Sequence, residues 1–319
     1  MSGGETIGVD LGGTKALVGV LNGTETLWES REASTGQSED ELVELLVREI
    51  RAAREARPGA VAVGLGVPAT IDQETGVAVS AVNLPLSDLP LRDLVSERVG
   101  LPVFLDNDAN VAALAEHLYG AGRGGDHMVM LTIGTGIGGG LILNGELYRG
   151  STGAGAELGH TVIQADGPPC QGNCPNHGCV EALASGTALG REGLAAAESS
   201  PDSALGRALA EGKAVDGKLV TEAALAGDAT AVAVFELIGS RLGVACSSFA
   251  NIFQPNAIVV GGGVIAAGDL LLDPARRELR ERALTPMNQT PVLAATLGND
   301  AGMIGAAALA RVEMEKGAS

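Results

Sequence analysis

Short apolar runs broken by glycine occur twice along the chain, in the same order each time. Residues 6–23 predict a strand, a glycine turn, a second strand and a hairpin turn at Asn22-Gly23. Residues 132–145 repeat this plan and end at Asn144-Gly145. A repeated plan of this kind predicts two related domains that each begin with a hairpin.

The rest of the chain alternates helical patterns with short strand patterns. A helix predicted at residues 38–57 starts with a capping box of Ser38 and Glu41 and carries one apolar face. Strands are predicted at residues 60–67, 99–105 and 256–260, and helices at 109–119, at 223–253 and from about 299 onward. This alternation predicts an α/β fold, with two domains in close contact around a cleft.

Composition and charge narrow the class of protein. The 47 glycines among 319 residues are about twice the usual frequency and predict close approaches between backbones. The 21 Lys and Arg against 39 Asp and Glu give a net charge of −18, which argues against nucleic acid as a partner. Residues 242–268 are uncharged but hold polar residues at their middle, so we expect a buried helix and strand, not a membrane span. Without a secretory signal pattern, the expected compartment is the cytoplasm.

The two glycine turns carry the first candidate chemistry. Asp10 ends the first predicted strand, and Gly12, Gly13, Thr14 and Lys15 form the turn after it. Such a turn can face a phosphate with its N–H groups, and Asp10 can hold hydrated Mg²⁺, although one such turn taken alone is better explained as an ordinary hairpin. The second turn, with Thr135 and Gly136, favours the phosphate interpretation, because two turns can hold a polyphosphate from both sides of a cleft.

A polar cluster, Asp106-Asn107-Asp108, directly precedes the helix predicted at residues 109–119. Helix capping explains one Asp or Asn here but not the whole cluster. A carboxylate at the point where the chain enters a helix is suited to act as a general base. Asn107 beside it can orient a hydroxyl group.

A cysteine loop supplies the third candidate site. His160, Cys170, Cys174 and Cys179 form a Cys₃His set of the kind that holds structural Zn²⁺ in tetrahedral geometry. A disulfide with a spare thiol is the alternative, and His177 is a rival nitrogen ligand. Cys246 fits a buried core position. Glu157 and Glu181 flank the loop, so a metal can position them, although solvated surface positions explain them as well.

In this order and combination, the motifs resemble those of the ROK family of sugar kinases. The resemblance runs along nearly the whole chain through DLGGTK, Asn83 in VNLP, DNDAN, GTGIGGG, GAGAELGH, CVEALASG, GGGV and NDAGMIGAA. It implies the actin-like ATPase (ribonuclease H-like) fold, with two domains around a central cleft. The implied small domain is residues 1–109, completed by the C-terminal helix 299–319, and the large domain is residues 110–298 with the zinc loop.

The resemblance also implies an activity, the transfer of phosphate from ATP to the 6-hydroxyl of glucose with Asp108 as base. The implied sugar-binding residues are Asn83, Asn107, Asp108, Glu157, His160 and Glu181. The phosphates of ATP would face the two glycine turns, at Gly12, Gly13, Thr14, Lys15, Thr135 and Gly136. The adenosine would face Gly261, Gly262 and Gly263, and Asp10 would bind the Mg²⁺. Zn²⁺ would bind His160, Cys170, Cys174 and Cys179. The family spacing is usually C-x-C-x4-C, whereas three residues separate Cys170 from Cys174 here, so the first cysteine ligand stays open.

Other functions stay open from the sequence. Fructose, mannose, N-acetylmannosamine or allose as the sugar, or polyphosphate as the donor, would keep the same mechanism. A sugar sensor without turnover and an actin-like ATPase with a protein partner belong to other classes, and the presence of Asp10 and Asp108 argues against the sensor. With nine residues before Asp10, we expect no DNA-binding domain. We also expect no membrane partner, and the family suggests a homodimer or homotetramer.

Overall fold

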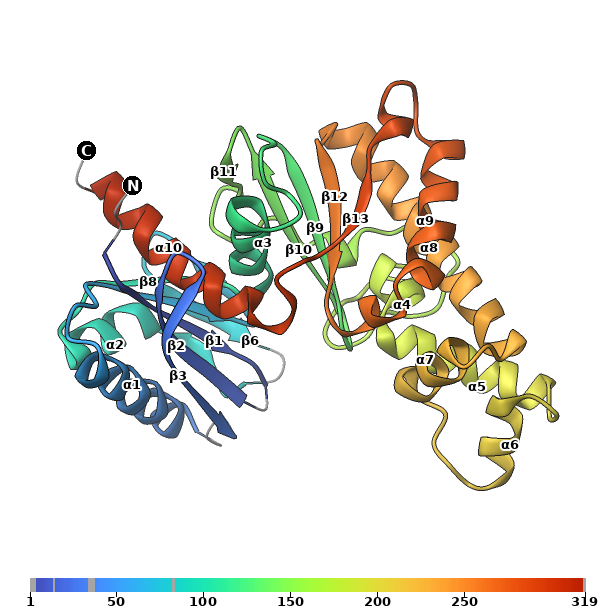
Figure 1. The fold of residues 1–319 in the computed structure, drawn as a ribbon, viewed down its shortest axis with the longest axis horizontal. Coiled ribbons are helices and arrows are strands. Elements are labelled where there is room, and N and C mark those ends of the chain that lie inside the picture. Colours follow the sequence, from blue (N-terminus) through green and yellow to red (C-terminus); the bar gives the residue numbers. More distant parts are fainter. Residues whose placement is uncertain (1–3, 14, 34–37, 82–83, 318–319) are drawn as a thin grey trace.

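The computed structural model describes residues 4–13, 15–33, 38–81 and 84–317. Thr14, predicted to face the ATP phosphates, and Asn83, predicted to bind the sugar, lie outside these residues. Two five-stranded sheets form the centre of the described chain, each covered by helices; in Figure 1 the first lies at the left and the second near the middle. The predicted α/β fold is therefore confirmed.

The first sheet holds both Asp10 and the polar cluster at residues 106–108. In spatial order it consists of β3 (Glu25–Ala33), β2 (Lys15–Asn22), β1 (Thr6–Leu11), β4 (Val63–Val67) and β8 (Val103–Asn107). β1 pairs antiparallel with β2 and parallel with β4, and β4 pairs parallel with β8. The register places Asp10, Gly66 and Asp106 side by side across the three parallel strands.

The second sheet repeats this plan. It consists of β11 (Glu146–Leu147), β10 (Ile137–Leu143), β9 (Met128–Ile133), β12 (Ala257–Gly261) and β13 (Val292–Ala294). Again two antiparallel pairs are followed by two parallel pairs. The predicted duplication of strand, glycine turn and strand is present in both sheets. A small third sheet of β5 (Ala69–Asp72), β6 (Val77–Ala81) and β7 (Ser87–Leu89) follows β4 in the chain.

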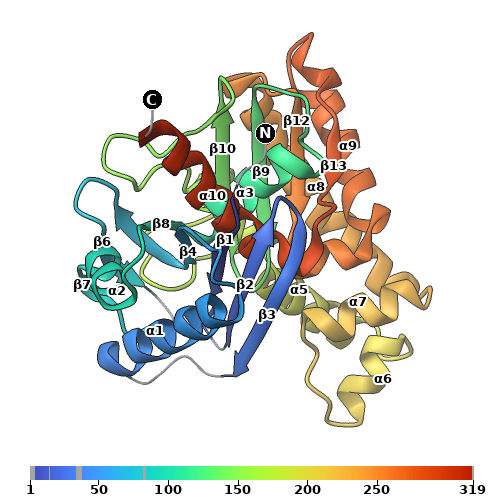
Figure 2. The same ribbon diagram turned by 60° about the vertical axis from the view of Figure 1, so that its left-hand side comes forward.

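Helices cover both faces of the large sheets (Figures 1 and 2). On one face of the first sheet lie α1 (Glu39–Ala56) and α2 (Leu91–Val99), and on the other lies α10 (Ala301–Gly317). Helix α3 (Asp108–Tyr119) packs between α10 and β10. The second sheet packs on α8 (Ala229–Phe253), which in turn packs on α9 (Asp269–Arg282). Shorter elements complete this side: α4 (Val180–Ala184), α5 (Gly186–Ser199), α6 (Ala204–Ala210), α7 (Gly217–Leu225) and the 3₁₀ turns η1 (Leu158–His160), η2 (Gly263–Ala267) and η3 (Met287–Gln289). A fourth 3₁₀ turn, η4 (Gly298–Asp300), directly precedes α10 and contacts it.

Glycine allows α10 to lie directly on the first sheet. A Cβ on Gly8 of β1 would overlap the carbonyl oxygen of Met303, and one on Gly64 of β4 would overlap that of Ala306. No larger residue fits at either position without moving the helix. The predicted close backbone approaches are therefore present where α10 meets β1 and β4.

The sequence patterns place some element boundaries wrongly. The strand predicted at residues 99–105 starts only at Val103, because Val99 ends α2 and Gly100 adopts a left-handed conformation with φ 66°. The helix predicted at residues 223–253 is two helices, because Gly227 has φ 86° and the Asp228 side chain caps α8 by accepting from Ala231 N. The strand predicted at residues 60–67 likewise starts only at Val63, as β4. The prediction of Ser38 as the N-cap of α1 is confirmed.

Helix α8 is a core helix, although its length and apolar character would allow it to cross a membrane. Half of its most apolar segment is buried inside the protein. Phe235, Leu242 and Phe249 on α8 lie in one core cluster with residues of β9 and β12. The expected buried helix and strand at residues 242–268 are thus confirmed as the end of α8 and β12. The domain boundary near residue 109 stays a prediction.

Candidate active site

The polar cluster at residues 106–108 forms the junction of β8 and α3. Asn107 is the N-cap of α3, and its Oδ1 accepts hydrogen bonds from Ala109 N at 2.9 Å and Asn110 N at 3.4 Å. Its Nδ2 donates to Ala69 O at 3.3 Å. Capping therefore occupies the Asn107 oxygen, and Asp108 begins the helix with Oδ1 2.9 Å from Ala109 N.

Two carboxylates with raised pKa values lie at this edge of the first sheet. Burial raises the pKa of Asp108, and the negative charge of Glu157 acts in the same direction, while hydrogen bonds from Ala109 N and its own backbone N–H oppose the change. Burial also raises the pKa of Asp10 to about 6; the charge of Asp108 adds to this shift and Lys15 opposes it. A desolvated carboxylate of this kind is suited to proton transfer near neutral pH.

A cavity of about 720 Å³ adjoins this edge. Its lining includes five residues predicted to bind substrate or metal, namely Asn107, Glu157, His160, Cys174 and Glu181, together with Thr135 and Gly136 of the second glycine turn. Residues of β5 and β6 also line it, namely Ala69, Thr70, Ser80 and Ala81. Its size and mixed polar lining are typical of a small-molecule site. Asp108 is not among the lining residues but follows Asn107, which is.

The predicted metal ligands lie together beside this cavity. The ligand atoms of His160, Cys170, Cys174 and Cys179 all lie within 4.8 Å of one another. Cys170 Sγ is 3.6 Å from His160 Nδ1, and Cys174 Sγ is 3.9 Å from Cys179 Sγ. In a tetrahedral zinc site with Zn–S bonds of about 2.3 Å, two sulfur atoms lie about 3.8 Å apart. The four side chains therefore fit Zn²⁺ in number, type and spacing.

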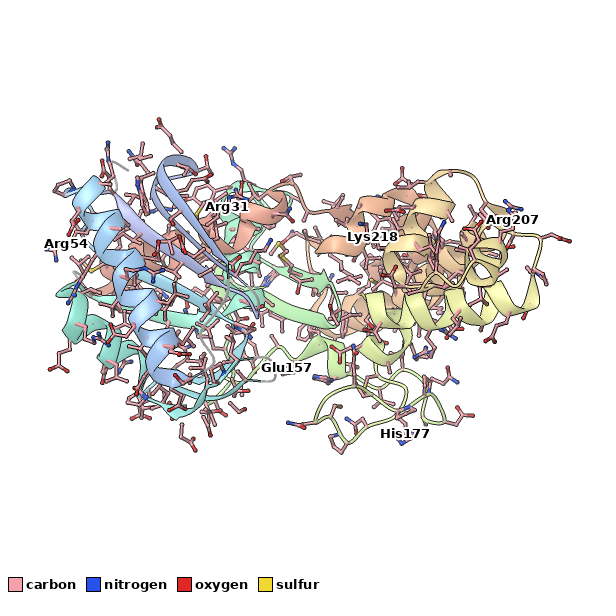
Figure 3. The ribbon with its side chains drawn as sticks, turned by 90° about the horizontal axis from the view of Figure 1, so that it is seen from below. Arg31, Arg54, Glu157, His177, Arg207 and Lys218 are labelled. Atoms are coloured by element: carbon pink, nitrogen blue, oxygen red, sulfur yellow. The ribbon has the colours of Figure 1, made fainter. Side chains whose placement is uncertain are left out.

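The structure distinguishes between a metal site and its alternatives, which were a disulfide with a spare thiol and His177 as the nitrogen ligand. All four cysteines of the chain are free thiols, and Cys246 is buried in the core. His177 lies outside the metal-ligand group, with Nδ1 3.3 Å from Gly167 O, and Figure 3 shows it on the outer loop. His160 directs Nδ1 toward Cys170 and Nε2 toward Glu157, 4.0 Å from Oε2. Although three residues separate Cys170 from Cys174, Cys170 thus lies with the other three candidate metal ligands.

The cysteine loop also holds the second glycine turn. Glu181 Oε2 accepts a hydrogen bond from Ile137 N at 2.8 Å, and its Oε1 accepts one from the Cys170 thiol at 3.5 Å. Gln171 Nε2 donates to Thr135 O at 2.9 Å. Glu181 is therefore no solvated surface residue, and the sequence did not indicate Gln171 at all. Both contacts join the candidate metal site to the turn that was predicted to bind phosphate.

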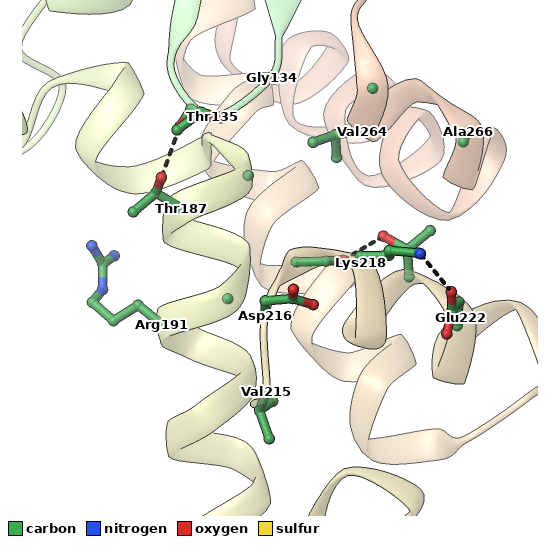
Figure 4. Close-up of a pocket in the computed structure, with 15 residues that line it drawn as sticks. Gly134, Thr135, Thr187, Arg191, Val215, Asp216, Lys218, Glu222, Val264 and Ala266 are labelled. Carbon is green, nitrogen blue, oxygen red and sulfur yellow. Dashed lines mark hydrogen bonds and ion pairs between the residues drawn. The ribbon is translucent and has the colours of Figure 1, made fainter. Parts of the chain in front are cut away.

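A second cavity of about 690 Å³ lies on the other side of this turn (Figure 4). Thr135 and Gly263 from the predicted set line it, together with residues of α5 and α7 that the sequence analysis missed: Gly186, Thr187, Gly190, Arg191, Lys218, Thr221 and Glu222. Gly186 and Gly190 are four residues apart on one helix face, and this spacing was the available signal. Thr187 Oγ1 donates to Thr135 O at 2.9 Å.

The remaining predicted glycines shape turns. Gly261 ends β12, and Gly262 has φ 85° with its Cα so close to the backbone of Ile133 that a side chain would not fit. Neither lines the second cavity. In the first glycine turn, Gly12 N donates to Lys15 O at 2.9 Å, which closes the turn beside Asp10. Gly13 belongs to the same turn.

Comparisons with known proteins agree with this arrangement. Residues 6–313 match the ROK family model. A glucokinase of Halalkalibacterium halodurans is 37% identical, over 98% of this chain and 97% of the relative. The crystal structure of a ROK family glucokinase from Streptomyces griseus in complex with glucose and AMPPNP has a TM-score of 0.83 and 38% identity, covering 97% of this chain and 99% of that one.

Repressors also occur among the relatives. The xylose repressor of Bacillus subtilis is 28% identical over 95% of this chain, which covers 76% of the repressor. The kinases are more similar to this chain than the repressor is, and they match it over almost their full length. From the family match, the duplicated sheets and the two cavities that meet at one glycine turn, we conclude that the chain belongs to the ROK family and has the actin-like ATPase fold of its sugar kinases.

Proposed function

We infer that the protein is a glucokinase that transfers the γ-phosphoryl group of ATP to the 6-hydroxyl of glucose, with Asp108 as general base. One observation carries the assignment of the two cavities: Thr135 lines both of them. A nucleotide in the cavity beside α5 and α7 would direct its phosphates across Thr135 and Gly136 toward a sugar in the cavity beside Asn107. The glucokinase relatives, one of them solved with glucose and AMPPNP, support this orientation.

In this proposal Asp108 accepts the proton of the 6-hydroxyl as its oxygen forms the new bond to phosphorus and ADP leaves. The raised pKa of Asp108 suits a base that must bind a proton during transfer and release it afterwards. Asn107, Glu157, His160 and Glu181 would hold the remaining sugar hydroxyls. Phosphoryl transfer requires positioning and charge neutralisation above all, and the chain supplies polar groups for both.

Asp10 is the proposed residue for Mg²⁺. Its carboxylate is a hard oxygen ligand of the type that Mg²⁺ prefers, and a pKa of about 6 indicates that a nearby cation would favour its ionised form. Bound Mg²⁺ would neutralise phosphate charge. Lys15 in the same glycine turn would contribute a second positive charge. Asp10 lies near the end of β1 and Lys15 starts β2, and the charges of Lys15 and Asp108 both act on Asp10.

We propose that Zn²⁺ bound by His160, Cys170, Cys174 and Cys179 has a structural role. With all four positions filled by protein, such a site takes no substrate. It would fix the His160 ring, with Nε2 toward the sugar, and would hold Glu181 and Gln171 against the second glycine turn. We further propose, from the family, a cytoplasmic homodimer or homotetramer.

A sugar-responsive regulator without turnover is the second candidate, because the repressor relatives match this chain over most of its length. Asp10 and Asp108, which have no evident task in a protein that only binds sugar, favour the kinase. Another hexose, or polyphosphate as the donor, would use the same residues.

The direct test is ADP release with MgATP and a panel of hexoses, measured for the unmodified protein, for Asp108→Asn and for Asp126→Asn as a control at an exposed position. We expect glucose-dependent turnover that Asp108→Asn lowers by about 10³-fold, within the range typical of a general base, and that Asp126→Asn leaves unchanged. Turnover with another hexose would change only the substrate. No turnover with any sugar or donor would contradict the proposed function and support the regulator.

A further inference from the structure

Arg149 lies in the loop that follows β11 of the second sheet, yet its side chain reaches the first sheet. Its Nε donates to Asp106 Oδ2 at 2.6 Å, and its Nη2 donates to Glu313 of α10 at 3.2 Å. Asp106 is fully buried, whereas the Arg149 and Glu313 side chains are 21% and 24% exposed. A charge-assisted contact of this length in a buried position is strong and directional.

Asp106 sets the geometry of the turn that leads to Asp108. Its Oδ1 accepts hydrogen bonds from Asn107 N and from Asn110 Nδ2, both at 2.8 Å. Within the described ranges, Arg149 is the one cation paired with this carboxylate. The position of Arg149 therefore fixes Asp106, and Asp106 fixes the backbone N–H of Asn107, the residue directly before the proposed base.

The other end of the Arg149 loop leads to the proposed sugar-binding residues. Arg149 O accepts a hydrogen bond from Gly155 N at 2.9 Å, which closes the loop, and Thr152 O accepts one from Gln73 N at 3.3 Å. Ala156, directly before Glu157, has φ 67°, a conformation rare for residues other than glycine. The loop thus holds a strained residue next to Glu157 while it contacts the chain segment after β5.

We propose that Arg149 is a positioning residue for phosphoryl transfer, which sets the place of the Asp108 turn relative to the loop that carries Glu157 and His160. The inference rests on the proposed function, because only a sugar held by that loop and attacked with the help of Asp108 would depend on this spacing. Proton transfer and in-line attack need the reacting groups within tenths of an ångström of their places, and a displacement of about 1 Å can cost 10²-fold in rate. Among the described residues, the side chain of Arg149 forms its hydrogen bonds with Asp106 and Glu313, and not with Asp108, Glu157 or His160.

The test is Arg149→Lys, which keeps the charge but cannot form two directed contacts with Asp106 and Glu313. Full removal of the charge would leave Asp106 unpaired in the interior and endanger folding. We expect kcat to fall about 10- to 100-fold and the KM for the hexose to rise, with the KM for ATP within twofold. Arg92→Lys is the matched control: Arg92 lines the same cavity of about 140 Å³ but contacts exposed Asp93 and Thr75 O instead of Asp106.

Folded Arg149→Lys protein with kcat and hexose KM within twofold of the unmodified values would overturn the proposal and leave Arg149 a purely structural role. If Arg149→Lys does not fold, Glu313→Gln carries the test, because it weakens the second contact of Arg149 and leaves the contact with Asp106 in place; its other loss is an ion pair with exposed Lys316. It should lower kcat about two- to fivefold, and unchanged kinetics would overturn the proposal. A failure of the proposed function is seen separately, as absence of hexose-dependent turnover in the unmodified protein.

Discussion

The two glycine turns occupy equivalent places in two sheets of the same plan, but they differ in what holds them. The first turn lies beside the ionisable side chains of Asp10 and Lys15, whose charges act on each other. The second has no ionisable side chain of its own, and its backbone is held from outside by Gln171, Thr187 and Glu181. One copy of the repeat thus contributes charge to the proposed phosphate site, and the other contributes a fixed backbone.

The largest effect should come from removing charge at the first turn. Asp10→Asn removes the proposed ligand of Mg²⁺, and we expect kcat to fall about 10²- to 10³-fold, as for loss of one electrostatic contact to the transferring group. The Mg²⁺ concentration for half-maximal rate should rise as well. Steady-state kinetics across a Mg²⁺ titration measure both quantities. If Asp10→Asn leaves turnover and the Mg²⁺ response unchanged, the first glycine turn does not act through the charge of Asp10.

The support of the second turn should depend on the metal site. Cys179→Ser, or removal of metal by a chelator, is expected to lower the melting temperature by several degrees and to raise the KM values for both ATP and hexose about tenfold, because structural zinc contributes to folding. Metal analysis and thermal unfolding provide the readouts. Cys246→Ala, which removes a buried thiol outside the metal-ligand group, should retain full metal content. Metal-free protein with unchanged kinetics would refute this dependence.

A smaller effect is expected from a single contact on the second turn. Gln171→Ala removes the hydrogen bond to Thr135 O and should raise the KM for ATP about three- to tenfold, a loss typical of one hydrogen bond, with metal content unchanged. Gln164→Ala, in the same loop and exposed, is the control. Equal ATP KM values for the two variants would mean that Gln171 does not support the turn.

The smallest effect concerns pH. A general base works when ionised, and since burial and the charge of Glu157 raise the pKa of Asp108, kcat should fall on acidification at a higher pH than an ordinary Asp would give. Glu157→Gln removes one cause of the shift, so the acid limb of the kcat profile should move to lower pH. If the acid limb of the kcat profile does not move in Glu157→Gln, the charge of Glu157 does not act on the carboxyl group that titrates.

Local patterns in the sequence predicted the local features of the structure. The capping box at Ser38, the repeated strand pairs and the Cys₃His set depend on residues near one another in the chain or on a compact motif. The Arg149 contact joins residues 43 positions apart in the chain, for which no local pattern exists. The second cavity combines α5 and α7 with the distant second glycine turn and Gly263, and the spacing of Gly186 and Gly190 was its one local signal. The break between α7 and α8 was missed because the alanine-rich pattern outweighed Gly227 and Asp228.

The seating of α10 on Gly8 and Gly64 has a consequence for synthesis of the protein. Thr6, at the start of β1, donates its side-chain hydrogen bond to Ala307 O, 301 residues later. At about 5–20 residues per second, translation needs roughly 10–40 s to proceed from the end of β8 to α10. During that time α10 is not yet available to cover one face of the first sheet. The sheet that is synthesised first is therefore expected to reach its final packing last.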